Sequence, residues 1–274
     1  MTDEIPPPRG ATGRLDGCEI RHASLVTPLF IAHAASVQGD RHIREGEPCE
    51  DVFLMGGADR WLFAVVCDGA GSAPHAIFGA RTVAAHLVDE LKDQVEEISL
   101  EAPQRVEEMV RGAIRAAREH CLLHGPSDDL TDYLSTVVLL ALSPEGGLVF
   151  HIGDGLAVAL TLTEEGPLST AVSPPENGEY ANITYFFSEP DWQRHLRVTT
   201  ISRCDAVLLM SDGVTAFASP RGDGVRPSFA QYILDDIFTG DEPGGLALAR
   251  VLVDARARAR SADDKTLLAV RVRR

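Results

Sequence analysis

Residues 62–69 read LFAVVCDG, an apolar run of strand length that ends in an aspartate and a glycine. The same arrangement returns in VFHIGDG at residues 149–155 and in VLLMSDG at residues 207–213. A single Asp-Gly pair is a common turn signal. Three apolar runs that each deliver an aspartate to the end of a strand instead indicate a site built at the edge of a β-sheet.

Two acidic pairs precede predicted strands instead of following them. The direction of the chain in a hairpin then predicts which other acids they lie beside. Glu50 and Asp51 come just before the apolar segment 52–55, and the stretch 56–60 joins that segment to the run that ends at Asp68. If the two segments form a hairpin, the first strand begins where the second ends. The open end of the hairpin then brings both acids close to Asp68.

A second hairpin is predicted further along the chain. Segments 136–142 and 148–152 are both apolar, and the stretch 143–147 between them contains turn residues. Pairing of these segments places Thr136, at the start of the first strand, near Asp154, just after the second. The geometry of the first hairpin is therefore repeated.

The remaining acidic pair, Asp263 and Asp264, precedes the apolar segment 266–272. If this segment runs antiparallel to the strand that ends at Asp212, these acids share the edge as well. Several carboxylates at one edge repel and raise one another's pKa unless a cation sits between them. Mg²⁺ and Mn²⁺ prefer oxygen ligands in near-octahedral geometry, so the pattern predicts a site for hard divalent ions.

Such a site favours one kind of chemistry. Two ions about 3.5–4 Å apart can bridge one water, lower its pKa and hold it in line with a phosphorus atom. The hydrolysis of a phosphomonoester then needs no protein nucleophile. The sequence agrees, because it has no Gly-x-Ser-x-Gly elbow, no P-loop lysine motif and no cysteine followed by a basic phosphate cradle.

The amino-acid composition indicates which classes of partner and which cellular compartment to expect. The 274 residues, 45% hydrophobic, are enough for one large domain. Lys and Arg number 25 against 41 Asp and Glu, and this net charge of -16 argues against nucleic acid or an anionic membrane as the main partner. The five cysteines are scattered without a Cys-x-x-Cys pair, and no apolar run approaches the roughly 20 residues of a membrane span. We therefore expect a cytoplasmic protein that is a monomer.

The order of the elements predicts the fold class. Helical periodicity over residues 77–91, 106–117 and 246–253 separates blocks of strand-like segments. Blocks of this kind indicate an α+β fold with antiparallel sheets, because a parallel sheet needs a helix between nearly every pair of strands. We expect a flexible tail at residues 1–17 and a domain at 18–274. Residues 169–197 are expected to form an irregular insertion, either an ordinary surface loop or a flap beside the site.

These residues resemble the type 2C, or PPM, family of metal-dependent protein phosphatases, in a divergent branch of bacterial type. The resemblance runs from about Val37 onward, and six motifs occur in family order. They are Glu50-Asp51, Asp68-Gly69-Ala70-Gly71-Ser72, Ser135-Thr136, Gly153-Asp154-Gly155, Ser211-Asp212-Gly213 and Asp263-Asp264-Lys265-Thr266. Each motif is weak alone, and six in register are strong.

The resemblance implies a fold and an activity. The fold is a four-layer sandwich of two antiparallel β-sheets flanked by helix pairs, with metals at one end of the channel between the sheets. The activity is hydrolysis of phosphoserine or phosphothreonine in a protein substrate by a water that Mg²⁺ or Mn²⁺ ions bridge. A phosphorylated protein and a cognate serine/threonine kinase are the implied partners.

The resemblance also implies roles for the acids. Asp68 would bridge two core ions, Gly69 would lend its carbonyl oxygen, and Asp212 and Asp263 would complete the paired site. Asp154 would help to hold a third, more weakly bound ion. The catalytic residues implied in this way are Asp68, Asp212 and Glu50, which acts through water. The residues implied to support the metal ligands are Asp51, Asp264 and Thr136, with Asp263 and Asp264 left as alternatives for the ligand itself.

The chain departs from the family at two places. The arginine that binds phosphate in the family falls at Gly46 here, so His42 and Arg44 are the candidates for that role, with Arg41 as a further one. The family's eukaryotic members often have a histidine within the glycine turn, where this chain has Ala70. Two other functions stay open. One is a non-catalytic regulatory module of the same fold, and the other is a hydrolase of small phosphate monoesters.

Overall fold

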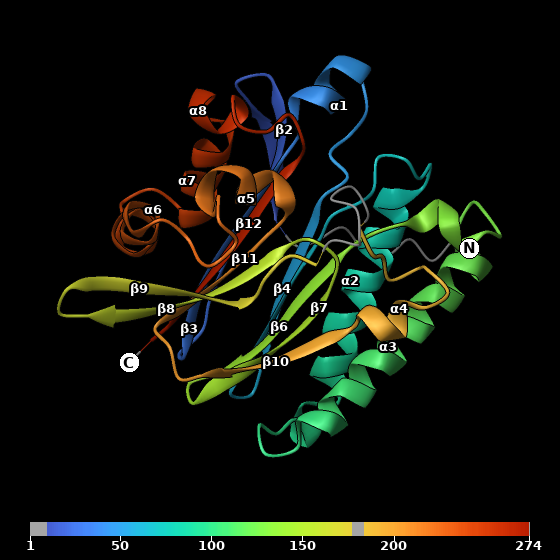
Figure 1. Cartoon of the computed structure of the whole chain (residues 1–274), viewed down its shortest axis with the longest axis horizontal. Helices are drawn as coiled ribbons and strands as arrows, with labels where there is room; N and C mark the ends of the chain where they lie inside the picture. The colour runs from blue at the N-terminus through green and yellow to red at the C-terminus, as the bar shows by residue number, and fades with distance from the viewer. Residues whose placement is uncertain (1–9, 177–183, 274) are drawn as a thin grey trace.

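Two antiparallel β-sheets face each other in the middle of the molecule (Figure 1). The structure is a computed structural model that describes residues 10–176 and 184–273. Within these residues, one sheet has seven strands in the order β1-β2-β3-β12-β11-β8-β9, and the other has five in the order β10-β7-β6-β5-β4. Strands that are neighbours in each sheet run antiparallel.

The strand bounds are as follows. The larger sheet contains β1 (Ala11–Leu15), β2 (Cys18–Val26), β3 (Phe30–Val37), β12 (Lys265–Val272), β11 (Ala206–Met210), β8 (Leu156–Thr163) and β9 (Gly166–Ser173). The smaller sheet contains β10 (Arg197–Ser202), β7 (Gly146–Ile152), β6 (Val137–Ser143), β5 (Trp61–Cys67) and β4 (Val52–Ala58).

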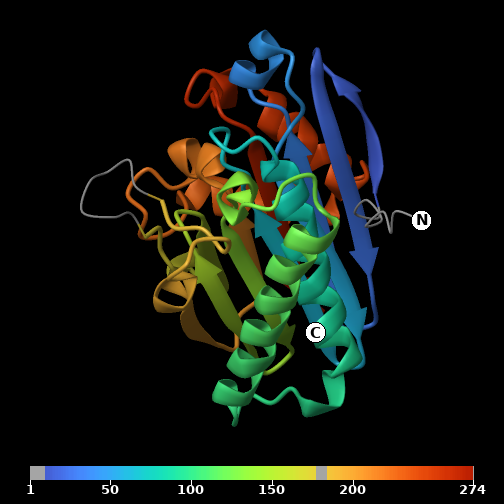
Figure 2. The ribbon, with the colours of Figure 1, turned by 90° about the vertical axis from the view of Figure 1, so that its right-hand side faces the viewer.

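Helices cover the outer faces of both sheets (Figures 1 and 2). The long helices α2 (Ala76–Asp93) and α3 (Pro103–His124) lie against the smaller sheet. The larger sheet is covered by α5 (Asp212–Ala218), α6 (Pro227–Tyr232) and α7 (Gly244–Val253). The shorter helical segments are α1 (Asp40–Glu45), η1 (Val95–Glu97), η2 (Leu130–Tyr133), α4 (Trp192–His195), η3 (Ile233–Ile237) and α8 (Ala255–Arg258). The predicted four-layer α+β sandwich is confirmed.

Strand β5 shows how the sequence builds these layers. Successive side chains of a strand point to opposite faces of its sheet. Phe63 and Val65 pack in the apolar cluster formed with α2 and α3, whereas Leu62, Ala64 and Val66 pack in the cluster between the sheets. Every residue of β5 is buried, as expected for a strand with both faces covered. The run at residues 62–67 is therefore continuous rather than alternating in polarity.

The predicted hairpins and helices are confirmed. Val52 pairs with Cys67 in the first hairpin, and Val137 pairs with Ile152 in the second. The periodic segments 77–91, 106–117 and 246–253 lie within α2, α3 and α7 respectively. Because hairpin partners are close in sequence, their pairing could be predicted from the positions of the turns.

Two expectations about irregular segments are wrong in part. The predicted flexible tail contains β1, which pairs with β2 through a turn at Asp16 and Gly17, both with positive φ (50° and 86°). An Asp-Gly turn of this kind favours a hairpin. The predicted insertion at 169–197 begins within β9, which pairs with β8, and it also contains α4. Residues 1–9 and 177–183 of these two segments lie outside the described residues.

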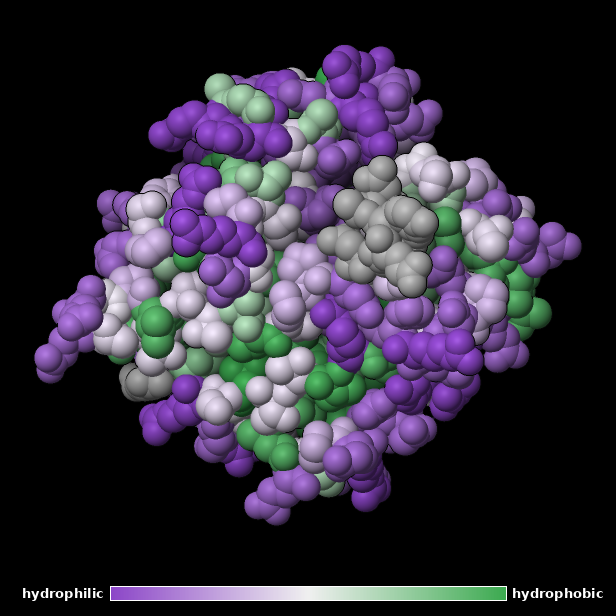
Figure 3. All heavy atoms as spheres, viewed as in Figure 1, coloured by the Kyte–Doolittle hydropathy of each residue, from purple (hydrophilic) through white to green (hydrophobic). Residues whose placement is uncertain are grey.

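The face shown in Figure 3 is mainly hydrophilic, and its apolar residues gather mostly in the lower middle of the view. In the part of the chain that the structure describes, none of the helices combines the length and apolar character needed to cross a bilayer.

Candidate metal centre and active site

The acids that the sequence placed at strand ends meet at one edge of the two sheets. The strand pairs β4–β5, β6–β7 and β11–β12 each bring the beginning of one strand beside the end of the other. A cleft of about 200 Å³ opens at this edge. Its lining residues are Arg41, His42, Asp68, Gly69, Ala70, Gly71, Thr136, Asp154, Thr184, Phe186, Asp212, Asp263 and Asp264.

Asp68 is fixed at the centre of the cleft by the start of β6. Its backbone N–H donates to Thr136 Oγ1 at 3.0 Å, and the Thr136 N–H donates to the Asp68 carbonyl at 2.9 Å. Gly69 forms an isolated antiparallel bridge with Ser135. Burial raises the pKa of the Asp68 carboxyl well above its ordinary value, and the charges of Asp51, Asp212 and Asp154 raise it further.

Asp51 lies behind the cleft and is fully buried. Its Oδ2 accepts a hydrogen bond from Ser211 Oγ at 2.8 Å, whereas its Oδ1 has no partner among the described residues. Burial, followed by the charge of Asp264, raises the pKa of Asp51 to about 8. The pKa of Asp212 is raised to about 6, first by burial and then by Asp154. Buried carboxyl groups are therefore crowded here, with too little positive charge nearby to keep them all ionised.

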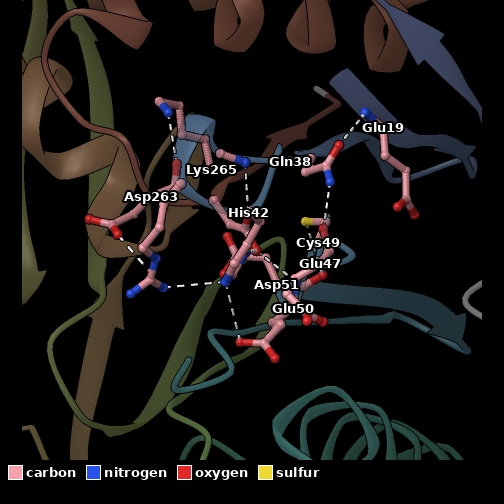
Figure 4. Close-up of polar contacts among 12 residues, drawn as sticks. Glu19, Gln38, His42, Glu47, Cys49, Glu50, Asp51, Asp263 and Lys265 are labelled. Carbon is pink, nitrogen blue, oxygen red and sulfur yellow. Dashed lines mark hydrogen bonds and ion pairs between the residues drawn. The ribbon is translucent and has the colours of Figure 1, made fainter. Parts of the chain in front are cut away.

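Asp264 is bonded at both carboxylate oxygens. Oδ1 accepts from the Gly39 N–H at 2.6 Å, and Oδ2 accepts from the Glu50 N–H at 2.6 Å and lies 2.9 Å from Nδ1 of His42. Burial works to raise the pKa of Asp264, but the bonds from His42, Gly39 and Glu50 outweigh it and the pKa is lowered. In Figure 4 His42 lies between Asp263 and Glu50, with its ring directed into this network.

Two glycines let the chain approach closely at the site. Gly153 adopts φ of 104°, which L side chains rarely adopt, and this conformation turns the chain from β7 into Asp154. At Gly213, a Cβ would lie 2.0 Å from the carbonyl oxygen of Asp264. The glycines that follow or precede the aspartates are thus required by the packing.

Residues 38–242 match the family model described as protein phosphatase 2C. The chain belongs to the protein phosphatase 2C family. It is 28% identical over 197 residues to serine/threonine-protein phosphatase 3 of Escherichia coli K12, covering 67% of this chain and 73% of that protein. It is also 33% identical over 125 residues to probable protein phosphatase 1N of Homo sapiens, which covers 46% of this chain and only 27% of the human protein.

Several solved structures share the fold. The serine-threonine phosphatase 2C of Toxoplasma gondii superposes with a TM-score of 0.67 at 18% identity, covering 93% of this chain and 99% of that one. The serine/threonine phosphatase Stp1 of Staphylococcus aureus gives a TM-score of 0.58 at 17% identity, with coverage of 93% and 99%. A structure of RsbX in complex with magnesium gives 0.56 at 14% identity, with coverage of 92% and 100%.

The acids of this 2C phosphatase fit a hard divalent ion in their chemistry. Among residues 10–176 and 184–273, no three His, Cys, Asp or Glu side chains stand in a preformed metal-ligand arrangement. Burial and the charges of neighbouring acids raise the pKa values of both Asp68 and Asp212. Buried carboxylates that raise one another's pKa mark a position that a cation favours. The unpartnered Oδ1 of Asp51 points to the same need for positive charge.

The phosphate-binding candidates are placed differently from the sequence expectation. Arg44 is exposed and does not line the cleft, whereas Arg41 does, and its Nη2 lies 3.9 Å from Asp263 Oδ1. His42 lines the cleft but is bonded to Asp264. Of the two arginines on α1, Arg41 therefore faces the cleft and Arg44 faces solvent.

The insertion contributes to the site in a way that the sequence did not reveal. Thr184 Oγ1 donates to Asp154 Oδ2 at 2.6 Å, and Phe186 lines the cleft. Thr184 stands in no motif, and the only signal was the aromatic composition of the segment. Glu50, by contrast, lies beside the cleft without lining it, with Oε2 at 3.7 Å from Nε2 of His42.

Proposed function

We propose that this 2C phosphatase hydrolyses phosphoserine and phosphothreonine in protein substrates with Mg²⁺ or Mn²⁺. The observation that carries the proposal is the convergence of Asp68, Asp154, Asp212 and Asp263 from separate strand ends on one cleft. The Escherichia coli relative, itself named a serine/threonine-protein phosphatase, supports the substrate class. The structural neighbour in complex with magnesium supports the choice of ion.

Each acid has a role in this proposal. Asp68, Asp212 and Asp263 would hold two core ions together with the carbonyl oxygen of Gly69, and Asp154 would hold a third. When bound, such ions supply an activated water and positive charge for the phosphoryl group.

The protein groups around these ligands keep them in position. Thr136 holds the backbone of Asp68, and Asp51 accepts from Ser211, which directly precedes Asp212. Asp264 fixes the start of β4 through the Glu50 N–H, and Glu50 would act on the site through water. Arg41 faces the cleft and would orient the phosphate, since a guanidinium offers several donors to phosphoryl oxygens.

The proposal extends to the setting of the enzyme. A serine/threonine kinase must supply the phosphorylated substrate. We propose that the protein works as a cytoplasmic monomer and binds neither nucleic acid nor membrane, consistent with its net charge of -16.

The test is phosphate release from a phosphothreonine peptide, with p-nitrophenyl phosphate as the small ester for comparison. We expect turnover of the peptide that depends on Mn²⁺ and stops on addition of EDTA. Asp68→Asn is expected to abolish it, and Asp89→Asn, which removes an exposed carboxylate from α2, to leave it unchanged. Efficient turnover of the small ester alone would contradict the substrate class, and binding of Mn²⁺ without any turnover would favour a regulatory module.

A further inference from the structure

A second cavity of about 230 Å³ lies outside the acidic cleft and shares no lining residue with it. It is bounded by β1, β2, β4 and α2. Its lining residues are Gly10, Ala11, Thr12, Glu19, Arg21, Phe53 and Arg81. Two guanidinium groups and one carboxylate therefore face a small space at the side of the sandwich.

Arg21 is buried although it is charged, with only 8% of its surface exposed. Its Nη2 donates to Glu19 Oε1 at 3.0 Å and to the carbonyl oxygen of Cys49 at 3.3 Å. Its Nη1 is buried and has no hydrogen-bond partner within residues 10–176 and 184–273. A buried donor without a partner costs free energy, so this nitrogen needs an acceptor in the cavity.

Arg81 contributes a second nitrogen that lacks a hydrogen-bond acceptor. Its Nε is also buried without a partner in the described part of the chain. Burial lowers the pKa of Arg81, and the charge of Arg21 lowers it further, while Glu19 acts in the opposite direction. The two arginines thus repel each other across the cavity, and a single carboxylate balances only one of them.

We propose that this cavity binds a phosphate-class oxyanion between Arg21 and Arg81. A tetrahedral oxyanion accepts several hydrogen bonds at once and would give acceptors to both guanidinium forks. The volume is below the roughly 300–1,000 Å³ of pockets for organic ligands, so it suits a small anion or a single phosphoryl group. In a chain of net charge -16, the buried Arg21 and the partly buried Arg81 supply the local positive charge that attracts an anion to this cavity.

An anion bound in this cavity would also affect the segment of chain that leads into β4. Arg21 holds the carbonyl of Cys49, and the next residue, Glu50, donates its N–H to Asp264. An anion that fixes Arg21 therefore steadies the chain that enters β4. The ligand needs no metal, which separates this site from the cleft.

The experiment follows thermal unfolding of the EDTA-treated protein as potassium phosphate replaces chloride at constant ionic strength. A ligand that binds only the folded state raises the Tm in a saturable way. We expect a saturable rise in the wild type and an apparent affinity about tenfold weaker in Arg81→Gln, which loses charge-assisted bonds. Arg115→Gln, which removes an exposed arginine from α3, is the matched charge control and should behave as wild type.

Further arms separate the competing explanations. Arg41→Gln should retain the phosphate effect, and loss of the effect there but not in Arg81→Gln would place the anion in the acidic cleft and overturn the proposal. A wild type that does not respond to phosphate would overturn it too, and would mean that the cavity holds only water.

Arg81→Lys, which keeps the positive charge but not the planar guanidinium group, should show an intermediate affinity. O-phosphoserine is the probe for a phosphorylated side chain, and binding of inorganic phosphate alone would assign the site to the free ion.

Discussion

Nδ1 of His42 lies 2.9 Å from Oδ2 of Asp264, and this contact ties helix α1 to the start of β12 across 222 residues of sequence. Because Asp264 also accepts the backbone N–H groups of Gly39 and Glu50, neither of its oxygens is left without a bond. Its neighbour Asp263 is half exposed and faces the cleft. We therefore propose that Asp263 is the metal ligand and that Asp264 holds the site together.

Substitution of these two acids should separate stability from activity. Asp264→Asn replaces an acceptor oxygen with a donor, and we expect a loss of about 2–3 kcal/mol in the free energy of unfolding, measured in urea. Asp263→Asn should change that free energy by less than about 0.5 kcal/mol and lower phosphatase activity instead. Equal destabilisation by both substitutions would contradict the assignment.

Arg41 and Arg44 provide a matched pair for substrate binding. Arg41 lines the cleft and Arg44 is exposed on the same short helix. Arg41→Gln should lower kcat/KM for a phosphopeptide about 10- to 100-fold, because it removes a charge-assisted bond to phosphate. Arg44→Gln should leave kcat/KM unchanged. The reverse order in steady-state kinetics would return the role to Arg44.

The metal-free protein should lose stability as the pH rises. Asp51, Asp68 and Asp212 have pKa values raised in the fold, so the folded state holds more protons than the unfolded state. Their contribution is complete below the ordinary aspartate pKa of 3.8 and is lost as the pH rises through about 6 and about 8. Thermal unfolding in EDTA should show a falling Tm over this window, and Mn²⁺ should remove most of the fall. A Tm that rises toward pH 8 without metal would contradict the account.

His151 should impose the opposite dependence at lower pH. It is fully buried, and burial followed by the charge of Arg197 lowers its pKa well below 6.5. The unfolded state therefore binds the extra proton first, and stability should fall by about 1.4 kcal/mol per pH unit below 6.5. We expect Tm to fall less between pH 7 and pH 5 in His151→Gln than in the wild type. The exposed His124→Gln is the control, and an identical slope in all three proteins would rule out this role.

The sequence predicted the sites of Asp68 and Asp154 because hairpin pairing is local and turn positions set the register. The placement of Asp212 beside the acids before β12 depended on an antiparallel pairing that the sequence could not establish, and the structure shows that pairing. The choice between Arg41 and Arg44 could not be predicted, since it depends on how a helix of six residues is turned against the cleft.

Contacts between segments that are distant in the sequence could not be predicted either. Arg21 and Arg81 are separated in sequence by strand β3, helix α1 and the β4–β5 hairpin, and no periodic pattern connects them. The bond from Thr184 to Asp154 lies in a segment without regular periodicity. In each case the contact depends on the packing of layers, which sequence patterns do not encode.

The most direct test of the central claim is a parallel titration with Mn²⁺, in which calorimetry reports binding and phosphate release from a phosphothreonine peptide reports activity. We predict that both rise over the same range of Mn²⁺ concentration in the wild type. Asp68→Asn should lose both, and Asp154→Asn should mainly weaken activity. Phosphate release that persists in EDTA, or near-wild-type rates in both variants, would contradict the assignment of these acids to a catalytic metal centre.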